Sequence, residues 1–349
     1  MTLKSRLALF AAAAALTLSV PASAQFLGKS ADDQMPDGGR LAAPVWSPKP
    51  TALPPYVAPN KPVWRIKDIL ASHRGQTDWV EPIVRNKDQD ADYKSLGPGK
   101  KTKAMFYSDN RMIFFVYDGS IKVSIDGVAQ EPFVATKGFM VNVPFRHVFT
   151  LENVGTTPAV YFEVRNAGDI PLYPETETPT PVPGMTYMKV TGSPGPVKDR
   201  TTNPIYVDFL KMVANDDKNY SNKFVWDDHF TSNILRGKGA PVPPDSNKGH
   251  FHINMTEFWY VAEGSIGMKL EGEPYFKTEV GDIITAVAGR WHRAGNDPSA
   301  PISVRIPINP RPPIMHNFEI DPNAPPPGQG RGARGAAGGA AAPAGGATP

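Results

Sequence analysis

The sequence has 349 residues, 40% of them hydrophobic, with a formal net charge of only +3 and no cysteine. A chain of this length is expected to form two domains with separate cores. Its basic residues are scattered rather than clustered, which argues against DNA or RNA as a partner. Without cysteine, disulfides and thiolate ligands are excluded, so any metal must be bound by His, Asp or Glu.

Residues 1–24 have the pattern of a secretory signal peptide. Lys4 and Arg6 give a positive start, residues 7–20 form an Ala/Leu-rich apolar run, and a small-residue cleavage site ends at Ala24. The apolar run is shorter than the roughly 20 residues that span a bilayer. We therefore expect cleavage after Ala24, a mature protein without a membrane span, and a periplasmic or secreted location.

Residues 25–62 are rich in proline and have no sustained apolar period, so an extended linker is expected. A short helix is predicted from Val63 to His73, where apolar residues stand at mixed helical spacing before Gly75. The chain then continues as short runs of Val, Ile, Phe and Tyr separated by turn residues. This pattern predicts an all-β sandwich or barrel.

Two β modules are predicted, over residues 63–168 and 185–320. Residues 169–184 are rich in Pro and Thr and are expected to link them, because proline lacks the donor that a central strand needs. A weak internal repeat supports the division, since a shift of 145 positions aligns Gly119 with Gly264. Residues 321–349 are rich in Pro, Gly and Ala and are expected to be disordered.

The second module contains a pattern suited to metal binding. Residues two apart on a strand lie on one face, so His250 and His252 point together while Phe251 points away. Glu257 follows a short bend, where a paired strand can return its carboxylate to the same pocket, and His292 can reach the pocket from across the barrel. A lone HxH pair is more often a surface or core feature, so the full pattern carries the prediction.

Together these residues resemble the two motifs of the cupin superfamily, G-x5-HxH-x3,4-E-x6-G and G-x5-PxG-x2-H-x3-N. The matched positions are His250, His252, Glu257 and Gly264, then Gly281, Gly289, His292 and Asn296. Two positions depart from the motifs: Val287 replaces the proline, and Pro244 stands where the first glycine is expected. The resemblance implies a double jelly roll, or bicupin, with one divalent transition metal (Fe, Mn, Ni, Cu or Zn) bound by His250, His252, Glu257 and His292.

The first module departs from this ligand set. Met105, Tyr107 and Met112 stand at the corresponding positions, and Phe149 stands where the last histidine is expected. We therefore expect residues 63–168 to form a degenerate cupin that keeps the fold without the metal.

Strand alternation also suggests substrate contacts. Trp259 shares a face with Glu257 and is predicted to form an apolar wall of the pocket, whereas Arg290 shares a face with His292 and is predicted to anchor a substrate carboxylate. The alternatives are that Trp259 is only core and that Arg290 is solvated. Tyr260 has the opposite parity and is expected to pack between sheets or subunits. His316 lies outside both motifs.

Three imidazoles and one carboxylate would leave about two positions open on a six-coordinate ion. Together with the expected signal peptide, the resemblance implies an exported metal-dependent enzyme acting on a small organic molecule, with an oxygenase-type reaction on a small acid or phenol as the first expectation. The alternatives are a metal-dependent lyase or isomerase, a non-catalytic protein that binds a small ligand or metal, and a tethered interaction module, which the ligand set disfavours. The aromatic sheet faces would permit a homodimer.

Overall fold

The computed structural model describes most of the two expected modules. The described residues are 45–108, 111–192, 203–213, 220–226, 231–238, 249–297, 299–300, 302–310 and 314–319. The expected signal peptide, the first part of the linker and the Pro/Gly/Ala-rich tail lie outside these residues. Within them, no helix combines the length and the apolar character that crossing a membrane requires.

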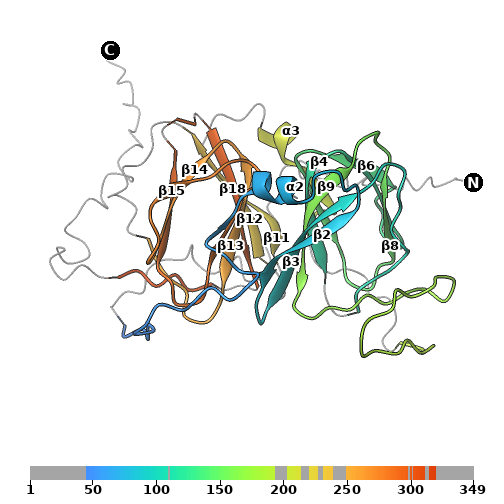
Figure 1. The fold of residues 1–349 in the computed structure, drawn as a ribbon, viewed down its shortest axis with the longest axis horizontal. Coiled ribbons are helices and arrows are strands. Elements are labelled where there is room, and N and C mark those ends of the chain that lie inside the picture. Colours follow the sequence, from blue (N-terminus) through green and yellow to red (C-terminus); the bar gives the residue numbers. More distant parts are fainter. Residues whose placement is uncertain are drawn as a thin grey trace, which may run out of the picture.

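The N-terminal module is a barrel of two antiparallel sheets (Figure 1, green and cyan). Its six-stranded sheet has the order β10 (Tyr206–Asp208), β7 (Phe139–Val143), β4 (Met112–Asp118), β9 (Ala159–Asn166), β3 (Gln89–Leu96) and β2 (Trp79–Arg85). Its three-stranded sheet has the order β6 (Phe133–Thr136), β5 (Ser120–Ile125) and β8 (Phe149–Asn153).

The C-terminal module repeats this plan (Figure 1, orange). Its six-stranded sheet has the order β1 (Val63–Trp64), β16 (Ile283–Ala286), β13 (Glu257–Glu263), β18 (Ile302–Asn309), β12 (Thr231–Lys238) and β11 (Tyr220–Trp226). Its three-stranded sheet has the order β15 (Phe276–Lys277), β14 (Ile266–Leu270) and β17 (His292–Asn296). The all-β double jelly roll predicted from the motifs is therefore confirmed.

Helices are short in the described part of the chain. The predicted helix is present as α2 (Ile66–Ser72), but its first residues, Val63 and Trp64, form strand β1 instead. The side chain of Asp282 fixes the start of the helix by accepting hydrogen bonds from the backbone of Ile66 and the guanidinium of Arg65. A second helix, α3 (Phe209–Val213), follows β10 directly.

Two short strands cross between the expected modules. Strand β1 pairs with β16 of the C-terminal sheet, and β10 pairs with β7 of the N-terminal sheet. The described part of the expected linker also lies against the C-terminal barrel, where the Tyr56 hydroxyl donates to the Thr285 carbonyl at 2.8 Å. Each expected module therefore contributes a strand to the sheet of the other, and the boundaries between them stay a prediction.

The two six-stranded sheets pack face to face around one shared core. Alternate residues of the central strands meet there: the ring centroids of Phe115 and Tyr260 lie 5.2 Å apart, and those of Phe162 and Phe258 lie 6.3 Å apart. Burial of each such side chain contributes about 2 kcal/mol. Tyr260 therefore packs between sheets, as its parity predicted. Because these faces are buried within the chain, a homodimer would need another surface and stays a prediction.

Candidate metal centre

The four predicted ligands meet at one end of the C-terminal barrel. His250 and His292 form an antiparallel bridge, with two backbone N–H···O bonds of 3.0 and 2.8 Å, and Glu257 begins the neighbouring strand β13. Gly249 permits the close approach of these segments, because its φ is +67° and a Cβ there would lie 2.6 Å from the His292 carbonyl oxygen. A residue with a side chain would force the bridge apart.

The ligand atoms form a compact group. The Nε2 atoms of His252 and His292 lie 2.9 and 3.1 Å from Glu257 Oε2, and the Nε2 atoms of His250 and His292 lie 3.1 Å apart. All four ligand atoms lie within 4.8 Å of one another. His252, Glu257 and His292 are buried, and His250 is half-buried.

Backbone carbonyls orient two of the imidazoles. The Nδ1 atom of His252 lies 3.0 Å from the carbonyl oxygen of Met315, and the Nδ1 atom of His292 lies 3.0 Å from that of Arg290. A carbonyl only accepts, so each Nδ1 carries a proton, and Nε2 is the ring nitrogen that each imidazole turns toward the centre. Such outer hydrogen bonds are typical of histidines that bind metals.

The charges at the site favour a bound cation. Burial alone would raise the pKa of the Glu257 carboxyl, but the neighbouring histidines hold it well below its ordinary value, so the carboxylate is ionised. Burial lowers the pKa of His250 to about 4, so this imidazole is neutral near pH 7. Three imidazoles and one carboxylate gathered at one point are the donor set of a divalent transition metal.

A further histidine stands at the rim of the site. The ring centroid of His316 lies 4.4 Å from that of His250 and 5.1 Å from that of His252. The antiparallel bridge between Phe251 and Asn317 holds this segment across the site. His316 belongs to neither motif, and no local pattern in the sequence marks it.

Trp259 lies inside the barrel, as its parity predicted. Its indole contacts the His292 imidazole in a T-shaped arrangement with ring centroids 5.1 Å apart, and it packs with the apolar interior residues Val261 and Ile284. Trp259 therefore packs against the predicted ligand His292 and is also part of the apolar interior of the C-terminal barrel. Its contact with a substrate stays a prediction.

Arg290 is not brought to the ligands. Its guanidinium donates to the carbonyl oxygens of Pro54 (3.1 and 2.9 Å) and Glu271 (2.7 Å), and it lies over the Tyr56 ring at 4.4 Å. These contacts fasten the N-terminal segment to the barrel. The guanidinium of Arg290 is therefore bonded to the protein backbone, and these contacts lend no support to its predicted role as a carboxylate anchor.

The corresponding place in the N-terminal barrel is apolar. Met105 and Phe149 form the same antiparallel bridge that His250 and His292 form in the C-terminal barrel. The ring of Tyr107 lies 6.3 Å from that of Phe149, and Met112 is fully buried. The expectation that this half keeps the fold without the ligands is therefore confirmed for these four positions.

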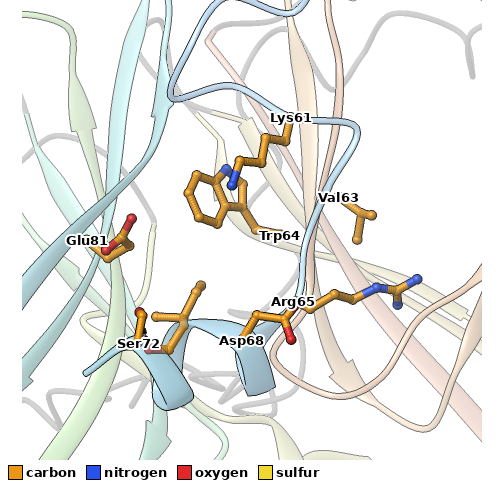
Figure 2. A pocket seen from close by; sticks show the side chains of 8 residues that line it. Lys61, Val63, Trp64, Arg65, Asp68, Ser72 and Glu81 are labelled. Atoms are coloured by element: carbon orange, nitrogen blue, oxygen red, sulfur yellow. Dashed lines mark hydrogen bonds between the residues drawn. The ribbon is translucent and has the colours of Figure 1, made fainter. Parts of the chain in front are cut away.

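A separate hollow of about 320 Å³ lies beside α2, at the seam between the modules. Figure 2 shows Trp64 and Lys61 on one side and Glu81 of β2 on the other, and the Lys61 ammonium lies 3.6 Å from the centre of the Trp64 ring. None of the four metal ligands lines this hollow, so it is distinct from the metal centre.

Comparison with known proteins agrees with the fold. No protein-family model and no curated protein matches the chain. A mutant of salicylate 1,2-dioxygenase from Pseudoaminobacter salicylatoxidans is 13% identical, with a TM-score of 0.53 over 74% of this chain and 87% of its own. A cupin 2 conserved barrel domain protein from Leptotrichia buccalis is 11% identical, with a TM-score of 0.49 over 71% of this chain and 96% of its own.

An oxalate decarboxylase from B. subtilis is 12% identical, with a TM-score of 0.47 over 80% of this chain and 88% of its own. The last two likenesses are too weak to support an argument alone. At such low identity the comparisons establish the fold: this chain has the double-barrelled cupin architecture that its motifs predicted.

Proposed function

We propose that this protein is an exported metal-dependent enzyme that acts on a small organic molecule, and that the reaction is of the oxygenase type on a small acid or phenol. The observation that carries the proposal is the convergence of three imidazoles and one carboxylate, with two of the imidazoles oriented by backbone carbonyls. Four donors leave about two positions open on a six-coordinate ion, which is the arrangement of a catalytic site.

The chain's own residues would divide the work at this site. His250, His252, Glu257 and His292 would bind the ion, which supplies Lewis-acid or redox chemistry when present. The Asn309 amide, 3.4 Å from Glu257 Oε1, would hold the carboxylate in place. Trp259 would wall the interior and exclude water beside His292.

A direct test is to purify the mature protein from its own compartment, measure bound metals, and follow oxygen uptake with a panel of aromatic acids and keto acids. Stoichiometric iron with oxygen uptake is the expected result. Stoichiometric zinc or manganese without uptake would favour a lyase or isomerase. A bound ligand without turnover would favour a binding protein. A mature protein that takes up no metal would contradict the proposal.

The export part of the proposal has its own test, because it depends on residues 1–24 alone. Cell fractionation should find the protein outside the cytoplasm, and N-terminal sequencing should begin at Gln25. A cytoplasmic protein that still begins at Met1 would contradict export and leave the metal site unaffected.

A further inference from the structure

One wall of the C-terminal barrel carries polar side chains that the motifs do not include. On β18, Val304, Ile306 and Ile308 face the core between the modules, so alternation turns Arg305 and Asn309 into the barrel interior. The bond from Asn309 to Glu257 confirms this direction for one of them.

Pairing across the sheet places the wall relative to the metal ligands. Arg305 pairs with the interior residue Val261 on β13, and on its other side with Leu235 of β12. Thr231, at the start of β12, pairs with Asn309, so both residues lie beside Glu257 in the sheet. Arg305 stands four residues before Asn309, about 13 Å along the strand, and its long side chain is close enough for the Glu257 charge to act on it.

The polar groups of this wall lack partners among the described residues. Thr231 Oγ1, Asn233 Oδ1 and Asn309 Oδ1 are buried without a hydrogen bond. Arg305 is half-buried, and neither a hydrogen bond nor an ion pair reaches its guanidinium from the described part of the chain. Burial lowers the pKa of this guanidinium below its ordinary value, and the Glu257 charge opposes the shift only in part. A desolvated charge without a partner is costly, so such groups accumulate where a ligand completes them.

The N-terminal barrel shows that the fold does not require this arrangement. Its strand β9 corresponds to β18, and its interior charges neutralise one another. Arg165 Nη1 lies 2.6 Å from Asp92 Oδ2, and Lys94 Nζ lies 2.6 Å from Glu163 Oε1. Among the described residues, these interior charges of the N-terminal barrel are paired, whereas Arg305 of the C-terminal barrel is not.

We propose that Arg305 binds a carboxylate of the substrate inside the C-terminal barrel, with Thr231, Asn233 and Asn309 as polar neighbours of the bound group. This inference rests on the proposed function and narrows its substrate class to carboxylic acids. It also moves the anchoring role predicted for Arg290 to Arg305, whose guanidinium has no partner in the described part of the chain. The side chain of Arg305 suits carboxylate binding, because a guanidinium presents paired donors that match the two oxygens of a carboxylate.

The test compares Arg305→Met and Arg305→Lys with the natural protein, each loaded with Mn(II) and checked for metal content. Oxalate and salicylate are titrated by calorimetry against their uncharged amides, oxamide and salicylamide. Arg74→Met serves as the matched control, because Arg74 is exposed, carries the same charge and lies outside the barrel.

In the natural protein, at least one carboxylate should bind more tightly than its amide. The Arg305→Met substitution should weaken that carboxylate on the order of 10- to 100-fold, with metal content and amide binding unchanged, and Arg305→Lys should weaken it less. The melting temperature of Arg305→Met should equal or exceed that of the natural protein, because an unpaired desolvated charge has been removed. Arg74→Met should bind as the natural protein does.

Equal carboxylate affinity in the natural protein and Arg305→Met would overturn the inference and leave the metal site standing. So would a metal-loaded natural protein that binds neither carboxylate. A lower melting temperature with carboxylate binding retained would assign Arg305 a purely structural role. Failure of the natural protein to take up metal would overturn the proposed function itself and this inference with it.

Discussion

The two barrels of this chain share one architecture and differ in what fills the same places. Where the C-terminal barrel has His250 bridged to His292, the N-terminal barrel has Met105 bridged to Phe149. The backbone frame is the same, so the frame alone does not make a metal centre. What distinguishes the C-terminal barrel is the set of four side chains that could hold a metal ion.

The two barrels also differ in how the charged side chains in their interiors are paired. Asp92 of the N-terminal barrel accepts from both Arg85 and Arg165, so its charge is neutralised inside the protein. Arg305 of the C-terminal barrel has no such partner among the described residues. The described interior charges are thus paired with one another in the N-terminal barrel, whereas Arg305 of the C-terminal barrel is left for the proposed ligand.

The largest expected effect is on metal binding, when the residues at one corresponding position of the two barrels are each replaced by alanine. His252→Ala removes one of four donors and should weaken metal binding by more than the roughly 100-fold that outer-shell changes reach. Tyr107→Ala, at the corresponding place in the N-terminal barrel, should leave metal content unchanged. Metal analysis after dialysis measures both variants. Unchanged metal in His252→Ala would break the comparison between the barrels.

The second effect tests the paired charges of the N-terminal barrel. Burial would raise the pKa of Asp92, but Arg165 and Arg85 hold it below its ordinary value. Its contribution to stability is therefore present above the unfolded pKa of roughly 3.9, and is lost as the pH falls through the lower folded value. Asp92→Asn should lower the free energy of unfolding at pH 7 by about 3 kcal/mol.

Urea unfolding at pH 7 and at pH 3 measures this effect, and the difference between the two proteins should shrink at the lower pH. Asp118→Asn is the matched control, because Asp118 is exposed at a strand end and carries the same charge. A difference that is constant between the two pH values would show that the Asp92 charge does not stabilise the barrel.

A smaller effect on metal affinity is expected from Asn309, whose amide contacts the predicted ligand Glu257. Asn309→Leu removes the amide that lies 3.4 Å from Glu257 Oε1. Loss of such a partner typically weakens metal binding at least about 10-fold. Competition with a chelating dye measures the affinity, and an unchanged value would show that the carboxylate is positioned without this contact.

The smallest effect is expected from the end of the chain. Cutting after Asp321 removes a segment whose Pro, Gly and Ala composition offers little apolar surface to bury. The melting temperature should stay nearly unchanged, as differential scanning calorimetry can show. A large drop would mean that this segment packs against a barrel.

The clustering of the four predicted ligands was predictable because local rules apply to them. Alternation predicts His250 and His252 on one face, a short bend returns Glu257 to it, and a turn at Gly289 precedes His292. The same rules identified Phe149 as the counterpart of His292. They also placed Trp259 in the interior and Tyr260 between the sheets, since both follow from parity along one strand.

What could not be predicted depends on contacts between distant segments. Nothing near His316 in the sequence shows that the next residue, Asn317, bridges Phe251, and nothing near Arg305 shows that the described residues around it leave it unpaired. Arg290 had suitable parity, but its guanidinium binds Pro54, which is 236 positions away. Helix propensity likewise gave no sign that Val63 and Trp64 would join the sheet of the other module.

The most direct test of the central claim is to locate the ion by anomalous diffraction from crystals of the metal-loaded mature protein. We predict one peak per chain, about 2 Å from the Nε2 atoms of His250, His252 and His292 and from the Glu257 carboxylate. No peak should appear between Met105, Tyr107, Met112 and Phe149. A peak elsewhere, or none after loading, would contradict the claim that these four side chains form the metal centre.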